Sequence, residues 1–229
     1  MRYLHKPTLK ETFIASGEYR CTRDGQPLAG GEQWAIYALP DGSHFMRFDG
    51  DWRDHDGTSV LAEALYQPAA MGRRIERYSR RDITAQGSWR TQYDFFEASV
   101  VIGWDDADNV RQDHEAALPA GYGVILSPPL LAGIGALQAV DAGGTQTAFL
   151  GFDTSHRGRP VIDTVTARIT GEGVVSVSGQ DVAAREITLT RAGDPAGIDR
   201  LWLDAAGFLL KHISPDGLVT ELYRIAHRP

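Results

Sequence analysis

The sequence has little of several features that assign proteins to a class. Its 229 residues include a single cysteine, Cys21, so the chain forms no internal disulfide and is not a disulfide-rich secreted scaffold. Positive charge is outnumbered, with 23 lysines and arginines against 30 aspartates and glutamates. The resulting net charge of −7 disfavours a general binder of nucleic acid or of anionic membranes, because both attract cationic surfaces.

Long apolar segments are missing as well. Residues Met1–Pro7 are followed by no apolar run of the ~7–15 residues that a secretory signal contains. The longest stretch without charge, Ala116–Val140, is interrupted by Gly121, Pro128 and Pro129, which argues against a membrane span. We expect a soluble protein that is cytoplasmic as the sequence stands; the periplasm stays open as an alternative if a leader has been removed.

The motifs of common catalytic and metal sites are also absent. The sequence contains no G-x-S-x-G nucleophile elbow, no H-E-x-x-H zinc motif and no phosphate-binding loop. Cys21 falls in an expected strand with no activating partner beside it, which favours a packed thiol over a nucleophile. Motifs therefore give no catalytic residue, no metal site and no cofactor.

A regular series of turn signals is present instead. Five Asp-Gly dipeptides, which suit the positive φ angles of tight hairpin turns, begin at Asp24, Asp41, Asp49, Asp56 and Asp216. Segments rich in aromatic and β-branched residues lie between turns along the whole chain. We predict strands at Glu11–Arg23, Gly31–Leu39, Ser43–Trp52, Ser59–Gln67, Arg73–Ile83, Ser88–Trp104, Thr145–Thr154, Pro160–Thr170, Gly173–Ser178, Val182–Arg191, Asp199–Asp204, Phe208–Ser214 and Val219–Ile225.

One helix is expected between two meanders of strands, which cover residues 11–104 and 145–225. Ser127 is a suitable N-cap, Pro128 fits the first helical position and Gly143 is a stop signal. The segment between them is apolar on every side, so this helix must be buried. A weaker helical pattern covers Asn109–Ala117.

These patterns predict a single β-rich domain over residues 1–229. We expect one large, strongly curved antiparallel sheet of about ten or more strands, forming an open or incomplete barrel. The buried helix, with its preceding loop in residues 116–142, would lie across the concave face of that sheet.

Aromatic residues concentrate on the expected strands, and this pattern has two interpretations. They are either an ordinary core, or the lining of an apolar pocket that the helix leaves partly open. Alternation along the strands and the phase of the helix indicate the same candidate lining. It consists of Trp34, Phe48, Tyr93, Phe95, Leu130, Ile134 and Trp202.

Two charged clusters offer further candidates. The segment Asp51–Asp56 places three carboxylates around His55, which suits a divalent cation or acid–base chemistry, but also suits a solvated hairpin loop. On a strand, Arg73, Arg77 and Arg81 share one face. They would either bind an anion such as phosphate or carboxylate, or pair with acidic neighbours.

The C-terminal third resembles a group of uncharacterised bacterial domains. The residues that carry the resemblance are Val177–Val182, Arg185–Thr190, Leu201–Asp204 and Phe208–Lys211, in which a tryptophan-aspartate strand end turns through a glycine into the next strand. Those domains are related in fold to the outer-membrane lipoprotein carriers, and the resemblance covers Gly173 to Ile225. It implies a curved, incomplete antiparallel barrel with a helical lid, and binding of acyl chains or other hydrophobic molecules.

Three functions remain open on the sequence. The leading hypothesis is a non-enzymatic domain that binds a hydrophobic or lipid-like small molecule under its buried helix. The alternative is an enzyme with a site built from scattered residues, with Asp54, His55 and the Arg73–Arg81 strand as first candidates. The third is a structural or interaction domain without a small ligand, which would expose an apolar patch.

Overall fold

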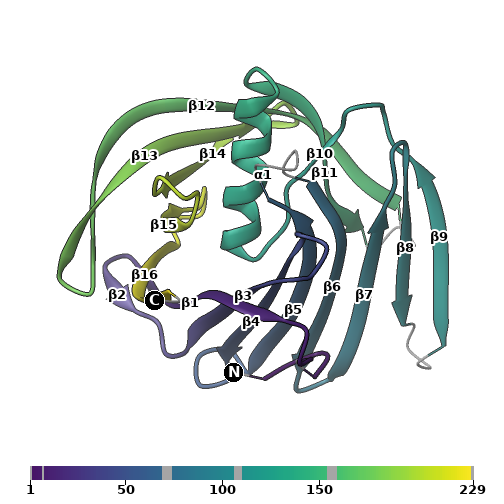
Figure 1. Ribbon diagram of the computed structural model, residues 1–229, viewed down its shortest axis with the longest axis horizontal. Coiled ribbons are helices and arrows are strands. Elements are labelled where there is room, and N and C mark those ends of the chain that lie inside the picture. Colours follow the sequence, from purple (N-terminus) through teal and green to yellow (C-terminus); the bar gives the residue numbers. More distant parts are fainter. Residues whose placement is uncertain (1, 7, 69–73, 106–109, 154–158, 228–229) are drawn as a thin grey trace. The chain divides into compact units, whose positions relative to one another are not determined.

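The protein is mainly β, with one helix in the part of the chain that the structure describes. The computed structural model describes all residues except 1, 7, 69–73, 106–109, 154–158 and 228–229 (Figure 1). The strands are β1 (Thr12–Arg23), β2 (Gln26–Pro27), β3 (Gly31–Ala38), β4 (His44–Trp52), β5 (Thr58–Gln67), β6 (Arg74–Thr84), β7 (Gly87–Phe95), β8 (Ser99–Asp105), β9 (Arg111–Ala117), β10 (Gly123–Val124), β11 (Thr145–Asp153), β12 (Arg159–Val177), β13 (Gln180–Arg191), β14 (Asp194–Leu203), β15 (Leu209–Ile213) and β16 (Val219–His227). The helix is α1 (Pro129–Asp141).

The strands form one 16-stranded sheet by hydrogen bonding. Their order is β10-β11-β12-β13-β14-β15-β16-β1-β3-β4-β5-β6-β7-β8-β9, with β2 paired to β1. Every pairing whose register is resolved is antiparallel except the short parallel pair of β10 and β11. The predicted fold class, a large antiparallel sheet that does not close into a barrel and carries one helix, is confirmed.

Contacts divide the chain into two compact units, which we describe one at a time. Unit 1 comprises Met1–Glu18, Ala29–Leu118 and Ile225–Pro229. Unit 2 comprises Tyr19–Leu28 and Pro119–Arg224. Unit 1 thus contains the meander of β3 to β9, and unit 2 contains the helix and the meander of β10 to β15.

Most of the Asp-Gly dipeptides form the predicted turns. Those beginning at Asp24, Asp41, Asp56 and Asp216 each separate two paired strands, and their glycines have φ between 75° and 85°. The fifth prediction is wrong, because Asp49 lies inside β4 with Gly50. A turn there would break the eight-residue register between β3 and β4, and Asp49 instead accepts hydrogen bonds from Arg2.

Two predicted elements near the end of unit 1 are also corrected. The segment Ser88–Trp104 is not one bent strand but the hairpin of β7 and β8, which the bond from Phe96 N to Ser99 O closes at 2.9 Å. The weak helix predicted over Asn109–Ala117 is also wrong, because Arg111–Ala117 form strand β9; Asn109 lies outside the described residues. Nearly all of β9 is exposed, so its sequence has no apolar periodicity that would distinguish a strand from a helix.

In unit 2, α1 is buried as predicted and packs against β10, β11, β12 and β15. Small residues permit this approach: a Cβ on Gly135 would lie 2.5 Å from the carbonyl oxygen of Val124. The predicted N-cap is wrong, because Pro128 occupies that position and no side chain caps the helix. No helix among the described residues has both the length and the hydropathy to span a membrane.

The two strands predicted at Pro160–Thr170 and Gly173–Ser178 are one continuous strand, β12. A register shift between Ile169 and Gly171 replaces the expected break, so the strand bends without ending. The long β12–β13 hairpin curves visibly along its length (Figure 1). Its turn consists of Ser178 and Gly179, both with positive φ.

Candidate ligand-binding face

One side of the unit 1 sheet collects aromatic side chains from four strands. We call it the aromatic face; its rings are Trp34 on β3, Phe48 on β4, Tyr78 on β6, and Tyr93 and Phe95 on β7. Cross-strand register puts them on one side, because Phe48 lies opposite Ala62 and Tyr78 lies opposite Ala64 on the intervening strand β5. On this side, strand β5 places the small side chains of Ala62 and Ala64 between Phe48 and Tyr78, and a further ring, Tyr66, lies two residues along the strand.

The rings of the aromatic face pack closely. Tyr78 and Tyr93 are stacked, with 5.7 Å between ring centroids and an interplanar angle of 16°, and Tyr93 lies 6.1 Å from Phe95. The Trp34 ring crosses β1 at Gly17, where a Cβ would lie 2.5 Å from its Cζ2 atom. Such rings supply much apolar contact area together with polar O–H and N–H groups.

A buried carboxyl, Glu32, lies on the same face as Trp34, two residues away on β3. Glu32 is 8% exposed, and its Oε2 atom has no hydrogen-bond partner among the described residues. Burial raises the pKa of Glu32 to about 8, because a charge is poorly solvated there. Its cross-strand neighbour is Gly50, which leaves no side chain opposite it. Glu32 is therefore an uncharged acid at neutral pH, with an oxygen free to bond.

Further polar groups lie on this face beside the rings. Arg80 lies opposite Ala62, and its Nε atom donates to both carboxylate oxygens of Asp82 at 2.9 Å. Burial raises the pKa of Tyr78 above its ordinary value. The face thus combines an apolar, ring-lined part with one paired guanidinium and one unpaired acid.

The opposite side of the same sheet carries buried charge. We call it the charged face. Arg47 on β4 donates to both oxygens of Glu11, at 2.7 and 3.0 Å, and its Nε atom lies 3.6 Å from Glu63. Its guanidinium carbon also lies 4.6 Å from the ring centroid of Phe45. The Arg47 hydrogen bond holds the pKa of Glu11 below its usual range.

The N-terminal segment completes the charged face. His5 contacts the buried carboxylate of Glu63 with its backbone N–H at 2.9 Å and with its ring Nδ1 atom. Arg2 pairs with Asp49 at 2.7 Å. Sequence reasoning missed this network. The available signal was Glu63, the single charge in the otherwise uncharged sequence of β5, and Arg47, the single basic residue besides a histidine in β4.

Four of the predicted lining residues belong to unit 1 and three belong to unit 2. Trp34, Phe48, Tyr93 and Phe95 share the aromatic face, whereas Leu130, Ile134 and Trp202 belong to unit 2. Leu130 and Ile134 are buried on α1. Trp202 lies on the side of β14 that carries charges, with the Arg200 guanidinium carbon 5.0 Å and the Lys211 Nζ atom 5.7 Å from its ring.

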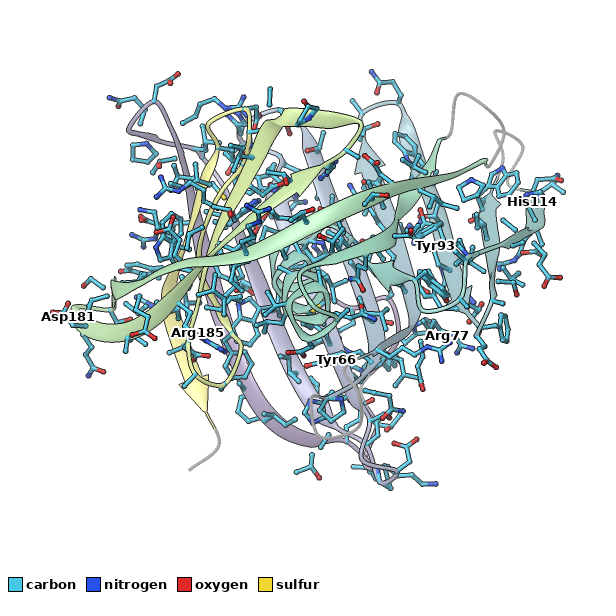
Figure 2. All side chains as sticks on the ribbon, turned by 90° about the horizontal axis from the view of Figure 1, so that it is seen from above. Tyr66, Arg77, Tyr93, His114, Asp181 and Arg185 are labelled. Atoms are coloured by element: carbon cyan, nitrogen blue, oxygen red, sulfur yellow. The ribbon has the colours of Figure 1, made fainter. Side chains whose placement is uncertain are left out.

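The described arginines of the predicted anion-binding strand bond to side chains on the neighbouring strand. Arg77 pairs with Asp94 at 2.5 Å, and Arg81 donates to Ser88 at 3.0 Å. Figure 2 shows Arg77 and Tyr93 on the same part of unit 1, but register places Arg77 on the side opposite the aromatic face. Arg73 lies outside the described residues.

The Asp51–Asp56 cluster lies at the β4–β5 turn and borders a polar cleft of about 440 Å³. Arg53 pairs with Asp51 at 2.6 Å, and the cleft also holds the Arg2–Asp49 pair. Across the described chain, no group of three or more His, Cys, Asp or Glu side chains is arranged to hold a metal ion.

The scattered residues of the alternative enzyme site are not brought together. His55 lies in the turn that precedes Thr58, whereas Arg77 pairs in register with Leu65. Seven residues of strand separate those two levels, which is about 23 Å at the usual rise.

Comparison with known proteins identifies a fold and no family. No protein-family model matches the sequence, and no curated protein matches it. The chain is similar to a solved β-barrel-like protein of the domain of unknown function DUF1849 from Brucella abortus, with a TM-score of 0.60, 12% identity, and coverage of 95% of this chain and 99% of that one. A DUF1089 family protein from Pseudomonas aeruginosa gives 0.41 at 12% identity, covering 92% and 95%.

The first of these similarities bears on the predicted resemblance. It supports a β-barrel-like fold, and it extends over nearly the whole chain instead of the C-terminal third alone. The finer relation to lipoprotein carriers stays a prediction. At this level of identity, likeness of fold does not carry an activity across.

Proposed function

We propose that the protein binds an apolar small molecule on the aromatic face of unit 1, and that the ligand carries an uncharged polar group. The observation that supports this most directly is Glu32. A buried oxygen without a partner costs free energy, roughly 1–3 kcal/mol, unless something bonds to it. A ligand hydroxyl or amide next to Glu32 would supply that bond.

The chemistry around Glu32 favours an uncharged ligand head. Because its pKa is raised to about 8, Glu32 holds its proton at neutral pH and both donates and accepts hydrogen bonds. An anionic head beside it would meet the same poor solvation that keeps Glu32 neutral. The apolar part of the ligand would lie over Ala62 and Ala64, between the rings of Phe48 and Tyr78.

The first experiment is native mass spectrometry of the freshly purified protein, followed by organic extraction of any bound molecule. The second is a titration of tryptophan fluorescence with 1-decanol and with decanoate at pH 7. We expect saturable binding of decanol, at least tenfold tighter than that of decanoate, since only the alcohol brings an uncharged head to Glu32.

Variants test the location of the ligand. Ala64→Phe would place a ring over β5 where we propose that the ligand lies, and is expected to weaken decanol binding at least tenfold. Trp202→Phe, an aromatic change in unit 2 on the side with Arg200 and Lys211, is the matched control and should leave binding unchanged. Equal decanol binding by wild type and Ala64→Phe, or no co-purifying molecule together with no saturable titration, would contradict the proposal.

A further inference from the structure

A second pocket lies wholly within unit 2, between the tip of the β12–β13 hairpin and strands β1 and β16. Its volume is about 460 Å³, within the range of small-molecule sites. Its polar side chains are those of Arg20, Ser176, Ser178, Glu221, Tyr223 and Arg224. None of these residues takes part in the aromatic face, so the pocket is independent of the function proposed above.

Two arginines in this pocket have no carboxylate partner among the described residues. The Arg20 guanidinium carbon lies 3.2 Å from the centroid of the Tyr223 ring, and that of Arg224 lies 5.1 Å from the same ring. Stacking uses the flat face of a guanidinium and leaves the N–H donors at its edge unused. Tyr223 therefore positions two cationic groups without neutralising either.

The hairpin tip is fixed against these arginines by a specific bond. The Ser178 hydroxyl donates to the carbonyl oxygen of Tyr223 at 2.6 Å. Ser178 has a φ of 53°, a conformation that residues other than glycine rarely adopt, and the bond to Tyr223 helps to hold it there. Ser176 and the hairpin turn consequently border the same pocket as Arg20 and Arg224.

The carboxylates near this pocket leave its positive charge in place. Glu221 also borders the pocket, but Lys211 pairs with it at 2.6 Å. Asp181 lies opposite Ser176 in the hairpin register, toward the end of the hairpin in Figure 2, and does not border the pocket. Two unpaired guanidiniums therefore face the pocket, with one carboxylate already neutralised.

We propose that this pocket binds the dianionic phosphate group of a small phosphorylated molecule. Two guanidiniums match the charge of a phosphate monoester, which is about −1.5 to −2 at pH 7, and their edges donate to its oxygens in pairs. The hydroxyl of Ser176 and the backbone of the turn would complete the contacts. The volume exceeds what inorganic phosphate needs, which favours an organic phosphate ester.

Isothermal titration calorimetry of the full chain at pH 7.5 and low salt tests the proposal, with inorganic phosphate and phenyl phosphate as probes. We expect saturable binding at one site. Tighter binding of phenyl phosphate would identify an organic ester as the ligand, and equal binding would identify the phosphate group alone. Both results support the phosphate site, whereas absence of saturable binding of both probes would overturn it.

Substitutions locate the site and separate binding from folding. Arg20→Ala and Arg224→Ala are each expected to weaken phenyl phosphate binding at least tenfold. Arg200→Ala is the matched control, because Arg200 also stacks on an aromatic ring but is paired with Glu186 at 2.8 Å. Arg20→Lys is the second variant at this position, for the case that Arg20→Ala destabilises unit 2 through loss of the ring contact. Lysine keeps the positive charge and the aliphatic stem. Phosphate binding that is unchanged in folded Arg20→Ala and Arg224→Ala variants would overturn the assignment.

Discussion

The two sides of the unit 1 sheet bury carboxyl groups in opposite ways. On the charged face, Glu11 and Glu63 both lie within ion-pair distance of Arg47, and Arg47 lowers the pKa of Glu11. On the aromatic face, Glu32 forms no ion pair with any described residue, and burial raises its pKa to about 8. Glu32 and Glu63 are both buried on strands, at 8% and 3% exposure, and they differ in the arginine that lies beside Glu63. Burial alone neutralises an acid, whereas burial beside an arginine keeps it charged.

The largest expected effect comes from removing the cation of the charged face. Arg47→Ala would leave Glu11 and Glu63 without their shared partner, and we expect the free energy of unfolding to fall by about 3–5 kcal/mol. Urea unfolding at pH 7 measures this. Arg53→Ala, which removes the exposed pair with Asp51, should change it by less than about 1 kcal/mol. Similar losses in the two variants would mean that the buried network does not differ from a surface pair.

The second prediction concerns Glu32 and the fall in stability as the pH rises. Because the folded pKa of about 8 exceeds the unfolded value near 4.5, the protonated acid favours folding. Stability is therefore complete below about pH 4.5 and is lost as pH rises through 8. At ~1.4 kcal/mol per pKa unit, the loss between pH 4.5 and 8 is on the order of 5 kcal/mol, of which about 3 kcal/mol falls between pH 6 and 8.

Glu32→Gln separates this effect from others. The amide cannot ionise, so the variant should show a flat profile between pH 6 and 9, where the wild type loses stability. Chemical unfolding at several pH values makes the comparison, with Gln33→Glu as a control that places a carboxyl at the adjacent exposed position. A wild-type profile as flat as that of Glu32→Gln would show that Glu32 is not neutral in the folded protein.

The contribution of Glu11 to stability depends on pH in the opposite sense and is smaller than that of Glu32. Its folded pKa is lowered by Arg47, so its contribution is present above the unfolded pKa and is lost as pH falls through the folded one. We expect Glu11→Gln to cost about 2 kcal/mol at pH 7 and to flatten the acid limb of the stability profile. Thermal unfolding between pH 2 and 7 tests this. Parallel acid limbs in the two proteins would refute the role of the Arg47 pair.

The smallest effect is expected at the rim of the charged face. The ring of His5 contacts Glu63 but is largely exposed, and the bond from its backbone N–H survives substitution. His5→Ala should therefore cost about 1 kcal/mol at pH 7, well below Arg47→Ala. Urea unfolding of the double variant with Arg47→Ala shows whether the two share Glu63. Strictly additive losses would mean that they do not.

Individual residues show how far the sequence predicted which side chains lie on each side of the sheet. The alternation that placed Trp34, Phe48, Tyr93 and Phe95 on one side also describes the structure, because side chains on a strand alternate with period 2. The same alternation assigned Trp202 to the lining, yet it lies with Arg200 and Lys211. Alternation with period 2 sorts the residues of one strand onto its two sides. It does not say which of those sides carries the same kind of environment as a given side of a distant strand.

The local features of this protein were determined by its sequence. Asp-Gly turns, strand alternation and an all-apolar helix depend on residues a few positions apart, so their effects are the same wherever the segment lies. Local patterns failed where they were weak, as in exposed β9, or where pairing overrode them, as at Asp49 and in continuous β12.

Only the tertiary structure decided which polar groups have partners. Arg47 meets Glu11 across 36 positions, His5 meets Glu63 across 58, and Ser178 meets Tyr223 across 45. Within the described part of the chain, the Oε2 atom of Glu32 meets no partner, and Arg20 and Arg224 share a ring instead of a carboxylate. The energy of a charge depends on what lies within a few ångströms of it, and for residues so far apart in sequence folding alone sets that distance.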